Sequence, residues 1–96
     1  MALFVVEHTH PSLGCPARNP QVAPALLQLV SEENAAKAGL TLHGDAVATG
    51  RHHLYLILEG PDVDSVRKYF APFAQLGTLA VTPSSHCEQV VSRGSC

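Results

Sequence analysis

Apolar and β-branched residues dominate the start of the chain, where "ALFVVEHT" covers residues 2–9 and predicts a strand. The stretch 11–20, "PSLGCPARNP", holds three prolines, a glycine and an asparagine, and is typical of turns. From about Val22 the apolar residues recur at helical spacing instead. Pro24 suits a first helical turn and Gly39 suits the residue after a helix end, so one helix is predicted from about 22 to 39.

Two further strands, 40–49 and 52–60, flank the turn "TGR" and predict a hairpin, with an irregularity at Gly44. A second helix is expected over 61–77, kinked or interrupted at Pro72. The run "TLAVTP" (78–83) predicts the last strand.

The resulting order, β-α-β-β-α-β, predicts an α+β fold of the ferredoxin-like type. It implies one four-stranded antiparallel sheet with strand order 4-1-3-2 and both helices on one face. We expect residues 1–83 to form this domain and residues 84–96 to form a cysteine-containing C-terminal tail.

The two faces of the predicted sheet are both apolar. Leu54, Leu56 and Leu58 alternate with Tyr55 and Ile57 along one central strand. Charged residues make up only 15% of the chain, below the roughly 25% usual for soluble domains. A sheet-to-sheet homodimer would cover the face that lacks helices, and the alternative is a ligand lying on that face.

Composition narrows the classes of partner. The formal net charge is −2 and the six Lys and Arg residues are scattered, which argues against nucleic acid. No apolar run reaches the roughly 18 residues of a membrane helix, and the N-terminus lacks the basic region of a signal peptide. A cytoplasmic location is therefore expected, where the three cysteines would be thiols or ligands and not disulfides.

Histidines gather at the ends of two strands that should be antiparallel neighbours. His8 and His10 end the first strand, and His52 and His53 begin the third, so both pairs are expected at one end of the sheet. Alternation places His8 and His10 on one face but sends His52 and His53 to opposite faces. Only one of the latter two can join the cluster, and the loop carrying Cys15 leaves from the same end.

Imidazole and thiolate ligands favour nickel, copper or zinc over magnesium or calcium. We therefore predict a transition-metal site, whose candidate ligands are His8, His10, Cys15, His52, His53 and Cys87. The alternative for each histidine is an ordinary solvated side chain at a strand end. His43, in the middle of an edge strand, is interpreted as such a surface residue.

The tail contains "SSHCEQVV", in which Ser85 and Glu88 have the spacing of a capping box. A short helix is expected from residue 86 to 93, with Cys87 in the first turn, where a helix dipole lowers the pKa of a thiol. Alternatively Cys87 packs with the tail's valines, or "CEQVV" forms a fifth strand that crosses to a partner subunit. Cys96 could bind metal, pair with Cys87 or be inert.

The element order, the length and the doubly apolar sheet resemble the dimeric α/β-barrel superfamily of ferredoxin-like proteins, over residues 2–83. The chain is similar in kind to small stand-alone members that bind nickel or are uncharacterised. This resemblance implies a homodimer, and the "HTH…C" and "HH" pairs point to a metal-binding member. The superfamily also includes cofactor-free monooxygenases, haem-handling enzymes and small isomerases, and no catalytic motif of those groups is matched.

Two functions remain open. The first is a metal-binding protein that stores, delivers or senses a transition metal. The second is a small-molecule enzyme in which a histidine is the general base, assisted by Tyr55 or Cys15. The sequence places no aspartate or glutamate clearly for orienting such a histidine, and the nearest carboxylates are Glu7 and Glu59. A haem-binding protein is a further alternative. The abundance of soft ligands favours metal binding.

Overall fold

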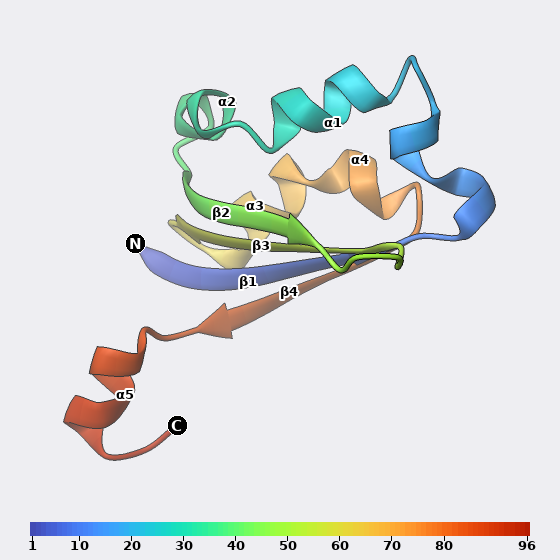
Figure 1. The fold of residues 1–96 in the computed structure, drawn as a ribbon. Coiled ribbons are helices and arrows are strands. Elements are labelled where there is room, and N and C mark those ends of the chain that lie inside the picture. Colours follow the sequence, from blue (N-terminus) through green and yellow to red (C-terminus); the bar gives the residue numbers. More distant parts are fainter.

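Four antiparallel strands form one open sheet, and four of the five α-helices cover a single face of it (Figure 1). The computed structural model describes residues 1–96. The elements, with two short 3₁₀ turns labelled η, are β1 (Ala2–Thr9), η1 (Ser12–Gly14), η2 (Pro16–Arg18), α1 (Ala23–Leu29), α2 (Glu32–Lys37), β2 (Thr41–Val47), β3 (His53–Gly60), α3 (Val63–Tyr69), α4 (Ala71–Ala74), β4 (Thr78–Ser84) and α5 (Cys87–Arg93). No helix has the length and hydropathy that crossing a bilayer requires.

The strands lie in the order β2-β3-β1-β4, which is the predicted order 4-1-3-2 seen from the other edge. The α+β class and the antiparallel sheet are therefore confirmed. β1 and β3 are the central pair, and their register runs from Ala2 opposite Gly60 to Thr9 opposite His53. The bulge in β2 falls between Leu42 and Gly44, where an irregularity was expected.

The hydrophobic core lies between the sheet and the helices. Alternate residues of the central strands point into it, because successive side chains of a strand face opposite sides. The core side chains from β1 and β3 are Phe4, Val6, Leu54, Leu56 and Leu58, and each is at most 6% exposed. Phe70 and Phe73, around the start of α4, close the core from the helical side.

The prediction of one helix over 22–39 is wrong, because the chain breaks between α1 and α2. Ser31 adopts an extended conformation and its hydroxyl oxygen accepts a hydrogen bond from the Asn34 backbone N–H at 3.2 Å, so it starts a new helix. The break also frees the carbonyl of Leu29, which accepts a hydrogen bond from the Tyr69 hydroxyl at 2.7 Å. The interruption is thus stabilised by a contact from a distant helix.

The second helical region divides as Pro72 predicted. Asp62 is the N-cap of α3, and its carboxylate accepts from the Ser65 backbone N–H at 2.7 Å; Phe70 is the C-cap. Pro72 then lies in the first turn of α4. Backbone N–H groups of a first turn have no partner within the helix, so a proline there costs no hydrogen bond.

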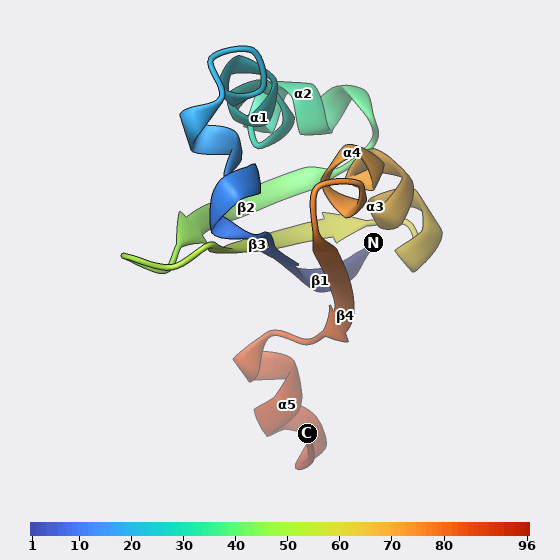
Figure 2. The same ribbon diagram turned by 90° about the vertical axis from the view of Figure 1, so that its right-hand side faces the viewer.

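The tail forms α5 and not a fifth strand, and Gly94 ends it in the left-handed conformation with φ 71°. The predicted capping pair of Ser85 and Glu88 is wrong by one residue. The side chain of Gln89 accepts from the His86 backbone N–H at 3.3 Å, while the Ser85 hydroxyl accepts from Arg93 at 3.1 Å. Figure 2 shows α5 on the side of the sheet away from the other helices.

The face of the sheet opposite α1–α4, which we call the open face, is apolar at its centre. Tyr55 and Ile57 of β3 are 40% and 47% exposed there, and Leu3 and Val5 of β1 are half-buried beside them. The prediction of two apolar faces is therefore confirmed for the central strands.

Candidate metal centre

Histidines from β1 and β3 meet where β1 ends and β3 begins. The pairing of Thr9 with His53 brings His10 opposite His52, and the His10 backbone N–H donates to the His52 carbonyl at 3.1 Å. Because Leu54 faces the helices, His52, two residues earlier, turns to the same side. The register thus selects His52, not His53, as the partner of His10.

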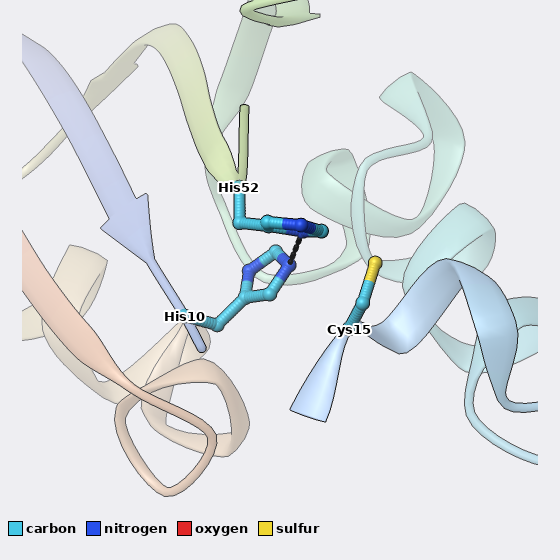
Figure 3. Close-up of side chains that lie close together, drawn as sticks. All are labelled: His10, Cys15 and His52. Carbon is cyan, nitrogen blue, oxygen red and sulfur yellow. Dashed lines mark hydrogen bonds between the residues drawn. The ribbon is translucent and has the colours of Figure 1, made fainter. Parts of the chain in front are cut away.

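Three side chains gather on the helical side of this end of the sheet, as Figure 3 shows. One candidate ligand atom from each of His10, Cys15 and His52 lies within 4.8 Å of the others, and all three residues are half-buried. His52 Nδ1 and His10 Nε2 are 3.2 Å apart and share a hydrogen bond. The end of β1 with the loop after it, and the residue before β3, therefore supply one compact donor set.

Cys15 is positioned by the proline-rich loop after β1. It lies between η1 and η2, where its own N–H donates to the Ser12 carbonyl at 3.4 Å and its carbonyl accepts from the Arg18 N–H at 3.1 Å. Pro16 begins η2 and is buried, which fixes the direction of the chain directly after the cysteine. The loop predicted from "PSLGCPARNP" thus holds the Cys15 backbone between two hydrogen-bonded turns.

A small enclosed cavity of about 80 Å³ adjoins the three side chains. Its walls include Leu26, Leu54 and Phe73 on the apolar side and Arg51 on the polar side. A volume of this size admits few water molecules, since each takes about 30 Å³ in the liquid. A group that bound beside the histidines would therefore be small and largely shielded from solvent.

His8 shares the face of His10, as predicted, but it stands behind the group of three. Its side chain is only 1% exposed, and its Nε2–H donates to the Phe73 carbonyl at 2.8 Å. Its ring stacks on His10 with the ring centroids 5.2 Å apart. With one nitrogen bound to a carbonyl, His8 acts as a packing support for His10 in this arrangement.

Burial lowers the pKa of both His8 and His10. For His8 the hydrogen bond to the Phe73 carbonyl opposes that effect, and for His10 the neighbouring His8 and His52 lower the pKa further. The rings are therefore neutral at neutral pH, which is the protonation state that binds metal. His10 Nδ1 is buried and has no hydrogen-bond partner, an unusual arrangement for a buried polar atom.

His53 lies on the open face, apart from the group. Its Nε2 is 3.3 Å from a carboxylate oxygen of Glu7, and its ring stacks on Tyr55 with the centroids 4.4 Å apart. It therefore has partners of its own on the other side of the sheet.

Cys87 and Cys96 are also placed away from the group. Both are exposed free thiols in the tail, and β4 ends with Ser84 opposite Leu3, at the start of β1. Cys87 is the first residue of α5, so it lies toward the end of the sheet opposite His10. Figure 1 shows α5 following the end of β4.

Two contributions to this region were missed by sequence reasoning. Arg51 lines the cavity from the turn between β2 and β3, and its position directly before "HH" was a signal that could have been used. The Phe73 carbonyl, which accepts from His8, left no signal because any residue supplies a backbone carbonyl.

The architecture defines the class of the protein as an α+β fold with an open four-stranded antiparallel sheet. Within that class, the chain belongs to the family described as Domain of unknown function (DUF3303), whose model matches residues 2–95. The matched range includes α5 as well as the sheet. No curated protein matches the sequence.

Proposed function

We propose that this protein binds a transition-metal ion through His10, Cys15 and His52, and that it stores, delivers or senses that metal. The observation that carries the proposal is the convergence of two imidazoles and a thiol to within 4.8 Å, with His10 and Cys15 from one stretch of the chain and His52 from another. Chance gathering of surface side chains explains this less well, because all three are half-buried and Cys15 lies between two hydrogen-bonded turns.

The distances fit coordination chemistry. Two ligands bound at about 2.0–2.1 Å with tetrahedral angles lie roughly 3.4 Å apart, close to the 3.2 Å between His10 Nε2 and His52 Nδ1. A small movement of the Cys15 thiol would complete a three-ligand site. Nickel, copper and zinc accept such a donor set, and the adjoining cavity has room for a small fourth ligand.

A titration with Co²⁺, a spectroscopic substitute for the native metal, tests the site. Thiolate coordination should give a near-ultraviolet charge-transfer band in the wild-type protein. Cys15→Ser should abolish the band. His10→Ala and His52→Ala should each weaken binding by more than about 10-fold, since losing even an outer-shell partner typically costs about 10–100-fold.

Matched variants on other parts of the chain provide the controls. Cys87→Ser removes a different thiol, and His53→Ala removes the histidine that faces Glu7, so both should retain the band. A wild-type protein with no band, or a band that survives in Cys15→Ser and disappears in Cys87→Ser, would contradict the proposal.

One observation favours a second candidate, a small-molecule enzyme with a histidine base on the open face. Glu7 lies 3.3 Å from His53 Nε2, so a carboxylate is placed to orient an imidazole, and Tyr55 stacks on the same ring. In a dimer of the α/β-barrel type, this face would enclose the reaction site. This candidate requires His53 and Glu7 for activity and tolerates the loss of Cys15, which is the reverse of the metal-binding proposal.

A further inference from the structure

The small cavity beside His10 and His52 has mostly apolar walls. It lies between the sheet and the helices, and its apolar lining comes from Pro16, Ala17, Leu26, Val47, Leu54 and Phe73. No aspartate or glutamate lines it, and its one arginine, Arg51, is an exposed residue of the turn before β3. An unpaired charge is costly to bury, so these walls favour an occupant without charge.

An apolar groove adjoins this cavity on the side of the helices. The groove has a volume of about 330 Å³ and is lined by residues of α1 and α4. Leu26 of α1 and Phe73 of α4 line both the groove and the cavity, so the two spaces meet at these side chains. No charged residue lines the groove. A small uncharged molecule can therefore approach the histidines from this side without meeting a charge.

A metal ion held by His10, Cys15 and His52 would engage the donor atoms that these residues turn toward one another. His10 Nε2 and His52 Nδ1 are the nitrogens 3.2 Å apart, and the Nε2–H of His8 is already bound to the Phe73 carbonyl. A buried water needs about two to four polar partners, and few would remain for it beside the ion. Three protein ligands leave a fourth coordination position open, and it adjoins mostly apolar walls.

We propose that the metal ion at this site takes an uncharged diatomic molecule, of the chemistry of carbon monoxide, as its fourth ligand, and that the cavity encloses this molecule. The ligand class rests on the proposed metal binding by His10, Cys15 and His52. A thiolate favours the soft ion Cu⁺, which binds such neutral ligands. The cavity of about 80 Å³ holds a diatomic molecule, whereas sites for larger ligands usually span about 300–1,000 Å³.

Xenon tests the cavity without any metal, because this apolar atom enters dry apolar cavities in proteins. Under xenon pressure the methyl NMR signals of Leu54, which lines the cavity, should shift, and those of Leu3 on the open face should not. Leu26→Phe enlarges a side chain of the cavity wall and should abolish the shift. Leu27→Phe makes the same change at the neighbouring side chain, which is 69% exposed, and should keep the shift.

The copper-loaded protein tests the ligand. Cu⁺ is added without oxygen, its retention is measured by mass spectrometry, and the C–O stretching band in the infrared reports bound carbon monoxide. One carbon monoxide should bind per copper. Leu26→Phe should weaken this binding by about 10-fold or more, since forcing an occupant into a filled space carries the cost of overpacking. Leu27→Phe should bind carbon monoxide as the wild type does, and circular dichroism checks that both variants are folded.

Failure of the diatomic ligand and failure of the metal site give different results. A wild-type protein that retains copper but forms no carbonyl, or whose Leu54 signals ignore xenon, overturns the diatomic ligand and leaves the metal site standing. A wild-type protein that retains no copper and shows no Co²⁺ band overturns both. Displacement of carbon monoxide by azide would show that the site prefers an anion, with Arg51 as the nearby positive charge, and would also overturn the proposal.

Discussion

His8 places an imidazole inside the core, between the Phe73 carbonyl and the ring of His10. Burial lowers its pKa, so the folded chain holds His8 neutral where an unfolded chain would already bind a proton. Protons therefore favour the unfolded state as the pH falls below about 6.5, the ordinary pKa of histidine. The lowered pKa of His10 acts in the same direction.

We expect the metal-free protein to lose stability between about pH 7.5 and about pH 5.5, as measured by urea unfolding. His8→Gln keeps a side-chain N–H but cannot be protonated in this range. That variant should be less stable near pH 7.5 and should lose less stability on acidification than the wild type. Equal slopes in His8→Gln and the wild type would refute this account.

The positions of some histidines in the candidate site could be predicted from the sequence, and those of others could not. Alternation along β1 was enough to place His8 and His10 on one face, and antiparallel pairing was enough to bring His52 and His53 near them. The choice between His52 and His53 needs the strand register, which short apolar strands do not encode locally. The role of His8 depends on a carbonyl 65 residues away, which no local pattern reveals.

Helix boundaries show where local chemistry overrides periodicity. The apolar spacing continues through Val30, but the Ser31 hydroxyl accepts a hydrogen bond from the Asn34 N–H and starts α2. The predicted helix is therefore divided in two. In the tail, Gln89 caps the His86 N–H, one residue later than the Ser85–Glu88 pair that the capping-box spacing favoured. The helical character of these segments could be predicted, whereas the helix ends depend on which of several neighbouring polar groups makes the capping hydrogen bond.

Gly77 is the residue through which the chain enters β4, and it lies against the end of β1. A methyl group at this position would overlap the Thr9 carbonyl oxygen and crowd the His10 Cα. Both clashing atoms belong to a backbone, so the strands themselves must move to make room. This glycine therefore sets the distance between β4 and the strand that carries His10.

Gly77→Ala should lower the free energy of unfolding by about 1–3 kcal/mol, the usual cost of overpacking, in a denaturant titration. Because His10 would move with the strand, Co²⁺ affinity should fall in the same variant. Gly14→Ala is the control, since no atom lies within 4 Å of a methyl group there. A fully stable Gly77→Ala protein would show that the strand ends separate freely.

In the molecule as a whole, α1–α4 form one layer over the sheet and α5 lies on the other side (Figure 2). Tyr55 and Ile57 expose apolar surface there, with Leu3 and Val5 beside them. Burying such a face releases about 25 cal/mol for each Å² of apolar area removed from water. A small domain gains much from this, because on its own it buries only about 60–65% of its unfolded surface.

We propose that two copies of the chain associate through their open faces. Sedimentation at micromolar concentration should then give a species of about 20 kDa, twice the 10.2 kDa chain. Ile57→Glu would place an unpaired charge in the contact and should yield monomer. Leu27→Glu changes an apolar side chain that is 69% exposed on α1, on the other side of the sheet, and should leave the dimer intact. A monomeric wild type, or dissociation by Leu27→Glu alone, would show that the open face is not the contact and would leave its apolar centre free for a small-molecule ligand.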